Sequence, residues 1–121
     1  MFIEKDLVAA SATPLVLGIL AEGESYGYAI IKRVNELSQG RMQWTDGMLY
    51  PLLHRLERAG HVSATWCVAD NGRRRKQYAI TDAGREVLTE RTAQWTVVAD
   101  ALQQVWQSTQ LPPAATPGWS R

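Results

Sequence analysis

The chain has 121 residues, of which 45% are hydrophobic and 21% are charged, so it is long enough for one domain with a buried core and too short for two. Its 13 basic and 12 acidic residues nearly cancel, and this balance alone neither supports nor excludes a nucleic-acid partner. The longest almost uncharged stretch, residues 7–21, is shorter than the roughly 20 apolar residues that a membrane span requires. The opening residues include acids where a secretory signal would carry Lys or Arg, and Cys67 is the single cysteine, so we expect a cytoplasmic protein without disulfides.

The first forty residues are predicted to be helical. A short helix is expected over residues 4–12, followed by a separate, largely buried helix for which Thr13 is the N-cap and Pro14 the first residue. Ser25 is expected to cap the next helix, which ends near Gly40. Apolar residues recur along that helix at spacings of three and four and form its apolar side: Tyr26, Ile30, Val34 and Leu37.

The third helix is predicted to follow the loop at residues 43–46 and to have two chemically different faces. A helical wheel gathers one apolar sector, Leu49, Leu52, Leu53, Leu56 and Ala59. The opposite sector carries Tyr50, Pro51, His54, Arg55 and Arg58. Pro51 has no N–H, so it belongs to the first turn or marks a kink, and the sequence leaves both possibilities open. One face therefore packs, and the other presents basic side chains.

From Val62 the apolar period changes to two, which predicts a β-hairpin around the turn Asp70-Asn71-Gly72. Thr81 or Asp82 is then expected to cap a long final helix. Along that helix runs an apolar stripe that calls for a partner chain: Leu88, Trp95, Val98, Leu102 and Val105. The last residues contain three prolines and no periodicity, so we expect a disordered tail.

Three helices, a two-stranded wing and a long closing helix are the element order of a winged helix-turn-helix, a mostly α fold with a small β-hairpin. Residues 50–76 hold six basic and two acidic side chains, while the segments on either side are net negative. We therefore predict DNA binding through the third-helix face at Tyr50, Pro51, His54, Arg55 and Arg58 and through the wing at Arg73, Arg74, Arg75 and Lys76. The alternative is that the basic run is only a solvated loop; its place beside a second basic face favours DNA.

The residues needed for catalysis or cofactor binding are scarce. His54 and His61 are the only histidines, and no pair of side chains has the spacing of a metal site or a nucleophile with its base. The glycines at positions 18, 23 and 27 do not follow a predicted strand, which excludes a dinucleotide-binding loop. We predict that the protein is not an enzyme and has no metal site and no cofactor.

Several strings resemble the PadR family of bacterial winged-helix transcriptional regulators over about residues 14–106: SYGYAI at 25–30, GMLYPLLHRLE at 47–57, RRRKQY at 73–78 and TDAG at 81–84. The resemblance implies a homodimer that binds a pseudo-palindromic operator, usually as a repressor, and is often released by a small aromatic or drug-like effector. Met48 departs from the Thr or Ser usual in the family. The single short last helix is similar to that of the smaller branch of the family.

The tryptophans are interpreted individually. Trp44 and Trp66 fall where the family places core or hinge aromatics, which implies no separate function for them. Trp95 lies on the predicted dimer stripe, where an indole could stack on a flat effector. Packing in the dimer core alone is an equally good interpretation of Trp95.

The sequence thus predicts a winged helix-turn-helix domain in residues 1–81, a dimerisation helix in 82–107 and a tail in 108–121. The expected partners are a double-stranded DNA operator, a second copy of the chain and a small aromatic ligand, and no membrane. A function of a different class, a protein-interaction or ligand-sequestering module that has lost operator binding, is favoured by Met48 and by the near-zero net charge. The fold alone serves both functions.

Overall fold

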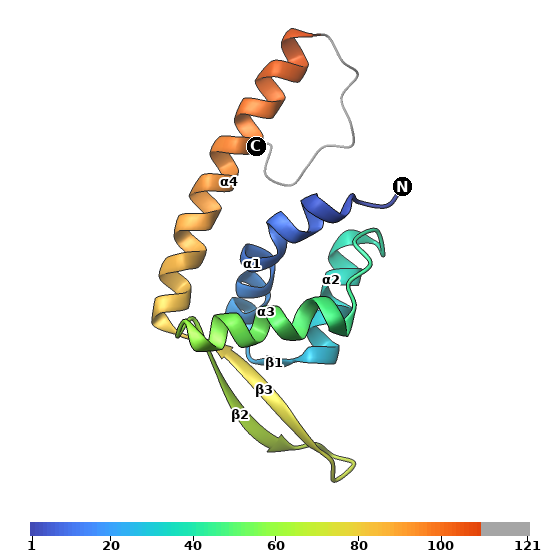
Figure 1. The fold of residues 1–121 in the computed structure, drawn as a ribbon, viewed down its shortest axis with the longest axis vertical. Coiled ribbons are helices and arrows are strands. Elements are labelled where there is room, and N and C mark those ends of the chain that lie inside the picture. Colours follow the sequence, from blue (N-terminus) through green and yellow to red (C-terminus); the bar gives the residue numbers. More distant parts are fainter. Residues whose placement is uncertain (110–121) are drawn as a thin grey trace. The chain divides into compact units, whose positions relative to one another are not determined.

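The computed structural model describes residues 1–109. These residues form, in chain order, helix α1, a short strand β1, helices α2 and α3, a hairpin of strands β2 and β3, and helix α4 (Figure 1). The chain divides into two compact units, Met1–Leu88 and the part from Thr89 onward. The mostly α fold with a small sheet is the predicted one, and the predicted tail lies, from residue 110, outside the described residues.

Helix α1 (Lys5–Glu22) is one continuous helix with Pro14 in its interior, so the prediction of two helices separated at Thr13 and Pro14 is wrong. Proline removes one hydrogen bond of the helix ladder, which favours a break. Residues on both sides of it, from Val8 to Leu20, are nevertheless buried in the same core. Burial of both halves offsets the lost bond and keeps the helix intact.

Strand β1 (Ser25–Tyr26) precedes helix α2 (Gly27–Ser38), so Ser25 is not the predicted cap. The backbone of Ser25 and Tyr26 pairs with β3 instead, in register with Tyr78 and Gln77. Pairing with a strand satisfies backbone groups that a helix start would leave open. Within α2, Ile30 and Val34 are buried as predicted, but Leu37 is exposed.

Helix α3 (Asp46–Arg58) supplies the centre of the core through the predicted leucines, Leu49, Leu52, Leu53 and Leu56, which are all buried. Ala59 was expected in the same sector but is exposed, because the helix ends before it and Ala59 is the C-cap. Pro51 is the sixth residue of the helix and so lies beyond the first turn. Trp44 is buried, as predicted for a core aromatic.

Strands β2 (Val62–Val68) and β3 (Arg74–Ile80) form the predicted hairpin, and β1 extends it to an antiparallel sheet in the order β1-β3-β2. Only the root of the hairpin joins the core, through Val62 and Tyr78. Toward the tip both faces are open to solvent, and the Trp66 side chain is 59% exposed. Trp66 is therefore not a core aromatic, because the hairpin extends beyond the helices that would cover it (Figure 1).

Helix α4 (Asp82–Ser108) begins at the root of the hairpin, and Thr81 is its cap. The Gly84 N–H donates to the Thr81 hydroxyl oxygen at 3.0 Å, and that hydroxyl donates to the Gly60 carbonyl at 2.6 Å. Gly84 lies directly against the His61 carbonyl, where a Cβ would collide with the backbone. These contacts all belong to the first unit and fix the start of α4 to the hairpin root.

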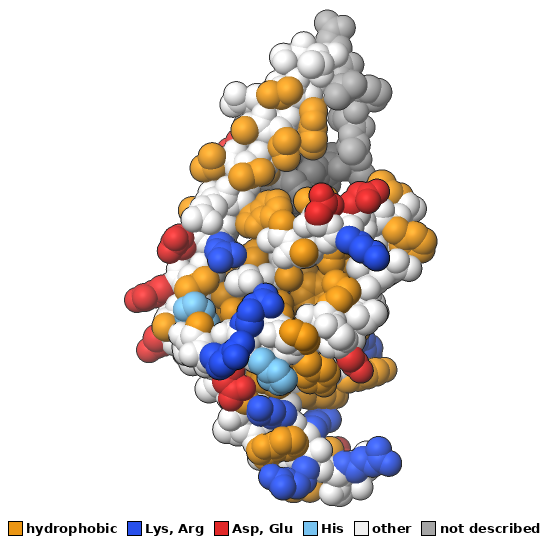
Figure 2. Space-filling view, in the orientation of Figure 1, with side chains coloured by type: hydrophobic (Ala, Val, Ile, Leu, Met, Phe, Trp, Pro, Cys, Tyr) orange, Lys and Arg blue, Asp and Glu red, His pale blue; other side chains and the backbone are white. Residues whose placement is uncertain are grey.

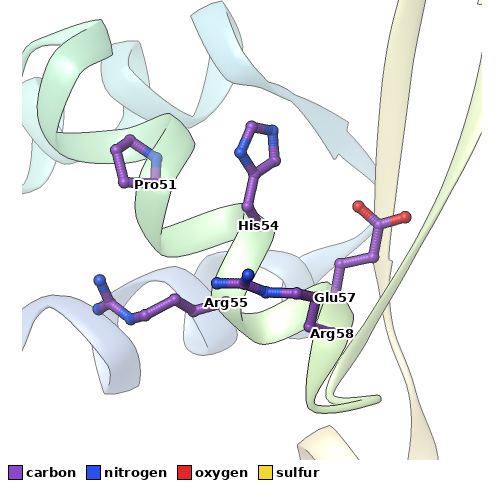
Figure 3. A pocket seen from close by; sticks show the side chains of 5 residues that line it. All are labelled: Pro51, His54, Arg55, Glu57 and Arg58. Carbon is purple, nitrogen blue, oxygen red and sulfur yellow. The ribbon is translucent and has the colours of Figure 1, made fainter.

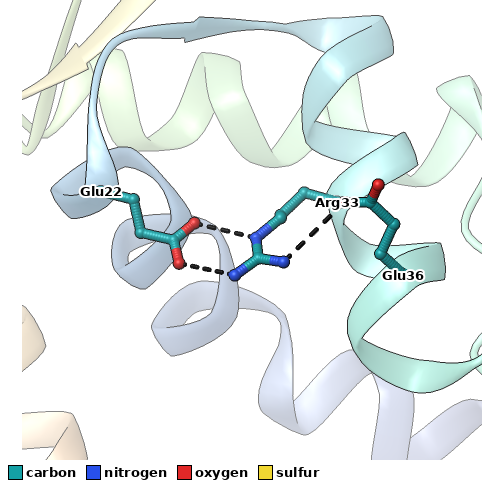
Figure 4. A network of polar contacts seen from close by, with 3 residues as sticks. All are labelled: Glu22, Arg33 and Glu36. Atoms are coloured by element: carbon teal, nitrogen blue, oxygen red, sulfur yellow. Dashed lines mark hydrogen bonds and ion pairs between the residues drawn. The ribbon is translucent and has the colours of Figure 1, made fainter.

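Arg33 connects α1 to α2 on the surface of the first unit (Figure 4). Its guanidinium makes two hydrogen bonds to the Glu22 carboxylate, at 3.0 and 2.8 Å, and approaches Glu36 to 3.8 Å. The hydrogen bonds and charge of Arg33 lower the pKa of Glu22 below its ordinary value of 4.5. The two-pronged geometry orients α2 against the end of α1.

Candidate nucleic-acid interface

The exposed side of α3 carries the side chains predicted to face DNA. Pro51, His54, Arg55 and Arg58 are all exposed and, with Glu57, line a shallow depression of about 610 Å³ (Figure 3). The buried leucines on the opposite side of the same helix hold this face outward. The structure therefore brings four of the five predicted α3 residues together on one accessible surface.

The fifth predicted residue, Tyr50, is held differently. Its side chain is 37% exposed, but the ring lies against the first residue of α2, where a Cβ on Gly27 would collide with the Tyr50 hydroxyl. Glycine at position 27 is therefore what allows α3 and the start of α2 to approach so closely. Tyr50 joins two helices as well as contributing to the exposed face.

The hairpin carries the predicted wing cations at and beyond its turn. Arg73, Arg74 and Arg75 are exposed, but Lys76 is half-buried and its Nζ lies 3.5 Å from Glu57 Oε1. Figure 3 shows the Glu57 side chain extending from α3 toward the strands of the hairpin. Lys76 thus has a partner within the protein, and the pair connects the wing to α3.

Two of the wing arginines stack on aromatic rings. Arg74 Cζ lies 5.0 Å from the centre of the Trp66 ring, and Arg75 Cζ lies 3.7 Å from the centre of the Tyr26 ring. Both distances are within the range of cation–π interactions. This role of Tyr26 and Trp66 was not predicted from the sequence, although a hairpin register centred on the predicted turn would have placed Trp66 diagonal to Arg74.

A groove of about 520 Å³ lies between the start of α2, helix α3 and the hairpin. Its lining combines aromatic rings with cationic groups, including Tyr26, Tyr28, Tyr50, Trp66, Arg74 and Arg75. Tyr78 lies at its base, where burial, with smaller contributions from Glu57 and Tyr50, raises the pKa of the phenol and favours its neutral form.

Figure 2 shows Lys and Arg side chains on one face of the first unit, over α3 and down the hairpin. Three acidic side chains lie on α3 and the hairpin: Asp46 at the start of α3, Glu57, which is paired with Lys76, and Asp70 at the turn. Lys and Arg side chains gathered on one face in this way attract a polyanion such as a nucleic-acid backbone.

The predicted dimer stripe lies on α4. Leu88 belongs to the first unit and packs against its core, and Trp95 is half-buried. Val98, Leu102 and Val105 are 48%, 43% and 59% exposed. An apolar row of this kind on a long helix is typical of a surface that another chain covers.

Residues 1–109 contain no group of three or more His, Cys, Asp or Glu side chains that could hold a metal ion. None of the helices in the described part of the chain is both long and apolar enough to cross a membrane.

A helix with an outward cationic face, set on a core of three helices and next to a hairpin with three exposed arginines, is the architecture of the winged-helix regulators of transcription. Residues 16–90 match the transcriptional regulator PadR-like family, and the chain belongs to this family. The resemblance seen in the sequence is thereby confirmed.

Two curated relatives carry regulator names. The chain is 40% identical over 75 residues to the transcriptional regulator Rv3488 of Mycobacterium tuberculosis, a match that covers 62% of this chain and 66% of the relative. It is 27% identical over 89 residues to the transcriptional regulator YqjI of Escherichia coli, covering 74% of this chain but only 41% of the relative. The chain therefore spans less than half the length of YqjI.

Solved structures of the family have the same fold. A PadR-like transcriptional regulator of Bacillus cereus superposes with a TM-score of 0.75 at 28% identity, covering 85% of this chain and 98% of that one. A PadR family transcriptional regulator of Eggerthella lenta gives a TM-score of 0.73 at 34% identity, covering 83% of this chain and 85% of the other.

Proposed function

We propose that this protein is a homodimeric repressor that binds a pseudo-palindromic operator, with α3 of each protomer in a major groove and the hairpin on the flanking phosphates. The observation that carries the proposal is the shared exposure of His54, Arg55 and Arg58 on the side of α3 opposite its buried leucines. Three exposed arginines at the hairpin adjoin that face within the same unit. The arrangement matches a helix that reads bases beside a wing that anchors the backbone.

The two elements have different tasks in this proposal. His54, Arg55 and Arg58 have side chains long enough to reach base edges, and arginine pairs with guanine through two hydrogen bonds. Tyr50 and Pro51 complete this face. Arg73, Arg74 and Arg75 contact phosphates, and Lys76 contributes less because Glu57 partly neutralises it.

Dimerisation is assigned to α4. The interface would be formed by the exposed apolar row of Val98, Leu102 and Val105. The half-buried Trp95 lies on the same stripe of the helix, and so does Leu88, which belongs to the first unit. Two copies of this row would cover each other around a two-fold axis, as palindromic operators require. The small aromatic effector is assigned to Trp95 and its symmetry mate, whose indoles would stack on a flat compound.

The proposal includes no catalytic role and no cofactor, and it places the protein in the cytoplasm, where a bacterial operator lies.

An effector acts only through its different affinities for the DNA-competent and DNA-incompetent states. Planar aromatics are therefore expected to quench tryptophan fluorescence and weaken operator binding together, and Trp95→Ala is expected to abolish both effects while preserving the dimer.

The decisive experiment is fluorescence anisotropy with labelled DNA from upstream of the protein's own gene and with a scrambled duplex of equal length. We expect the upstream DNA to bind about a thousandfold or more tightly. The double variant Arg55→Ala/Arg58→Ala should lose this preference, and Lys32→Ala, which removes an exposed cation from α2, should keep it. Equal affinity for both duplexes contradicts the proposal and favours the protein-interaction or ligand-sequestering module.

A further inference from the structure

The wing arginines differ from the cations of α3 in how they are held. Arg75 lies with its guanidinium 3.7 Å from the centre of the Tyr26 ring, and Arg74 lies 5.0 Å from the centre of the Trp66 ring. Within the described residues, neither arginine forms a salt bridge with a carboxylate. Aromatic rings, and not acidic groups, therefore fix the positions of both guanidinium groups.

A ring is a better support than a carboxylate for an arginine that must bind a phosphate. A carboxylate occupies the N–H donors of the guanidinium group and cancels its charge. The ion pair would have to break before the arginine could bind a phosphate. Stacking on a ring face leaves the donors at the edge of the guanidinium plane free and the positive charge intact. It also restricts the side chain before binding, which reduces the entropy lost on contact with DNA.

The location of the two rings agrees with such a role. Trp66 is 59% exposed, although tryptophan is highly buried on average. Tyr26 belongs to β1, which pairs with β3 only at Tyr78 and Gln77. Beyond that short ladder, the Tyr26–Arg75 stack is a side-chain link between β1 and the outer part of the wing.

We infer that Tyr26 and Trp66 are positioning residues of the DNA interface, each holding one wing arginine in place for a backbone phosphate of DNA. Tyr26 acts through Arg75 and Trp66 through Arg74, without themselves contacting the DNA. This inference rests on the proposed function. The four wing cations then fall into three kinds. Arg74 and Arg75 are each stacked on an aromatic ring, Lys76 is paired with Glu57, and Arg73 lies at the turn.

The first test measures operator affinity for Tyr26→Leu, with Tyr26→Phe as the matched control that keeps the ring. The leucine variant should bind about two- to fivefold more weakly, the range expected for an exposed cation–π pair, and the phenylalanine variant should bind like the wild type. In the Arg75→Ala background, Tyr26→Leu should cause no further loss. Wild-type affinity in Tyr26→Leu, or an equal loss with and without Arg75, overturns the inference.

Trp66→Leu and Trp66→Phe test the second stack at an exposed position where a folding defect is not expected, and their effects should depend on Arg74 in the same way.

A second measurement uses the DNA-free protein. Ring currents should shift the NMR signals of the Arg75 side-chain methylenes upfield, and Tyr26→Leu should remove this shift. If the shift is absent from the wild type, the stack and the inference fail while operator binding stands; if the wild type binds no DNA, the proposed function fails and every variant behaves alike.

Discussion

Helices α3 and α4 both show an apolar stripe in the sequence, but within residues 1–109 the stripe of α3 is buried far more completely than the stripe of α4. Leu49 and Leu53 of α3 are 0% exposed, whereas Val98 and Leu102 of α4 are 48% and 43% exposed. An apolar period therefore shows that a surface needs to be buried, but it does not show which chain buries it. In the proposed function, the outer side of α3 binds DNA and the exposed part of the α4 stripe packs against a second copy of the chain.

The stripe of α3 should be the more costly one to damage. Leu53→Ala would leave a cavity in the middle of the core, so we expect the free energy of unfolding to fall by about 2–5 kcal/mol. Urea denaturation followed by circular dichroism measures this loss. Val98→Ala, studied at a concentration too low for dimers, should change it by about 0.5 kcal/mol or less, and equal losses in the two variants would contradict the comparison.

The stripe of α4 should instead be sensitive to charge. Leu102→Asp would bury a carboxylate in the dimer interface, so the protein should sediment as a monomer. Operator affinity should then fall about a hundredfold or more, because the avidity of two linked half-sites is lost. Gln104→Asp, on the other side of the helix, serves as the control and should leave the dimer intact. A dimeric Leu102→Asp protein would place the interface elsewhere.

The outer side of α3 and the wing should differ in the kind of binding they supply. Arg55→Ala should cost about 1–3 kcal/mol against the operator and little against random DNA, because it removes a contact to a base edge. Arg73→Ala should weaken both duplexes similarly and flatten the slope of log affinity against log salt by about 0.9. Anisotropy titrations at several salt concentrations separate the two patterns, and an exchange of these patterns would reverse the assigned tasks.

The smallest effect is expected at the surface pair of Glu22 and Arg33, which orients α2 and so indirectly α3. Because Arg33 lowers the pKa of Glu22 in the folded state, the pair stabilises the fold above the ordinary carboxyl pKa. That stabilisation is lost as the pH falls through the lowered value. Glu22→Gln should therefore lower the melting temperature slightly at neutral pH and not at strongly acidic pH. A constant difference across this range would show that the pair does not act through charge.

The parts that local periodicity determines were predictable from the sequence. The wheel of α3 separates its buried leucines from its exposed cations correctly, since each side of a helix faces one environment along its whole length. The hairpin and its turn were also predictable, because the alternation of side chains and the turn residues are short-range signals.

The parts that depend on distant residues were not predictable in this way. Pro14 predicts a break by its own chemistry, but the common core around α1 overrides it. Ser25 and Tyr26 look like the start of a helix until β3, about fifty residues later, provides a strand for them to pair with. The family resemblance placed Trp66 among core or hinge aromatics, but it could not show where the hairpin of this chain leaves the core.

The junction between α4 and the hairpin has a mechanical consequence. The Thr81 N–H and hydroxyl bind the carbonyls of His61 and Gly60, and Gly84 leaves no clearance above the His61 carbonyl. Because these contacts hold the two elements together without a gap, we expect any rotation of the first turn of α4 about its axis to turn the root of the hairpin as well. The hairpin extends away from its root, so a small rotation there would displace the arginines near the turn by a larger distance.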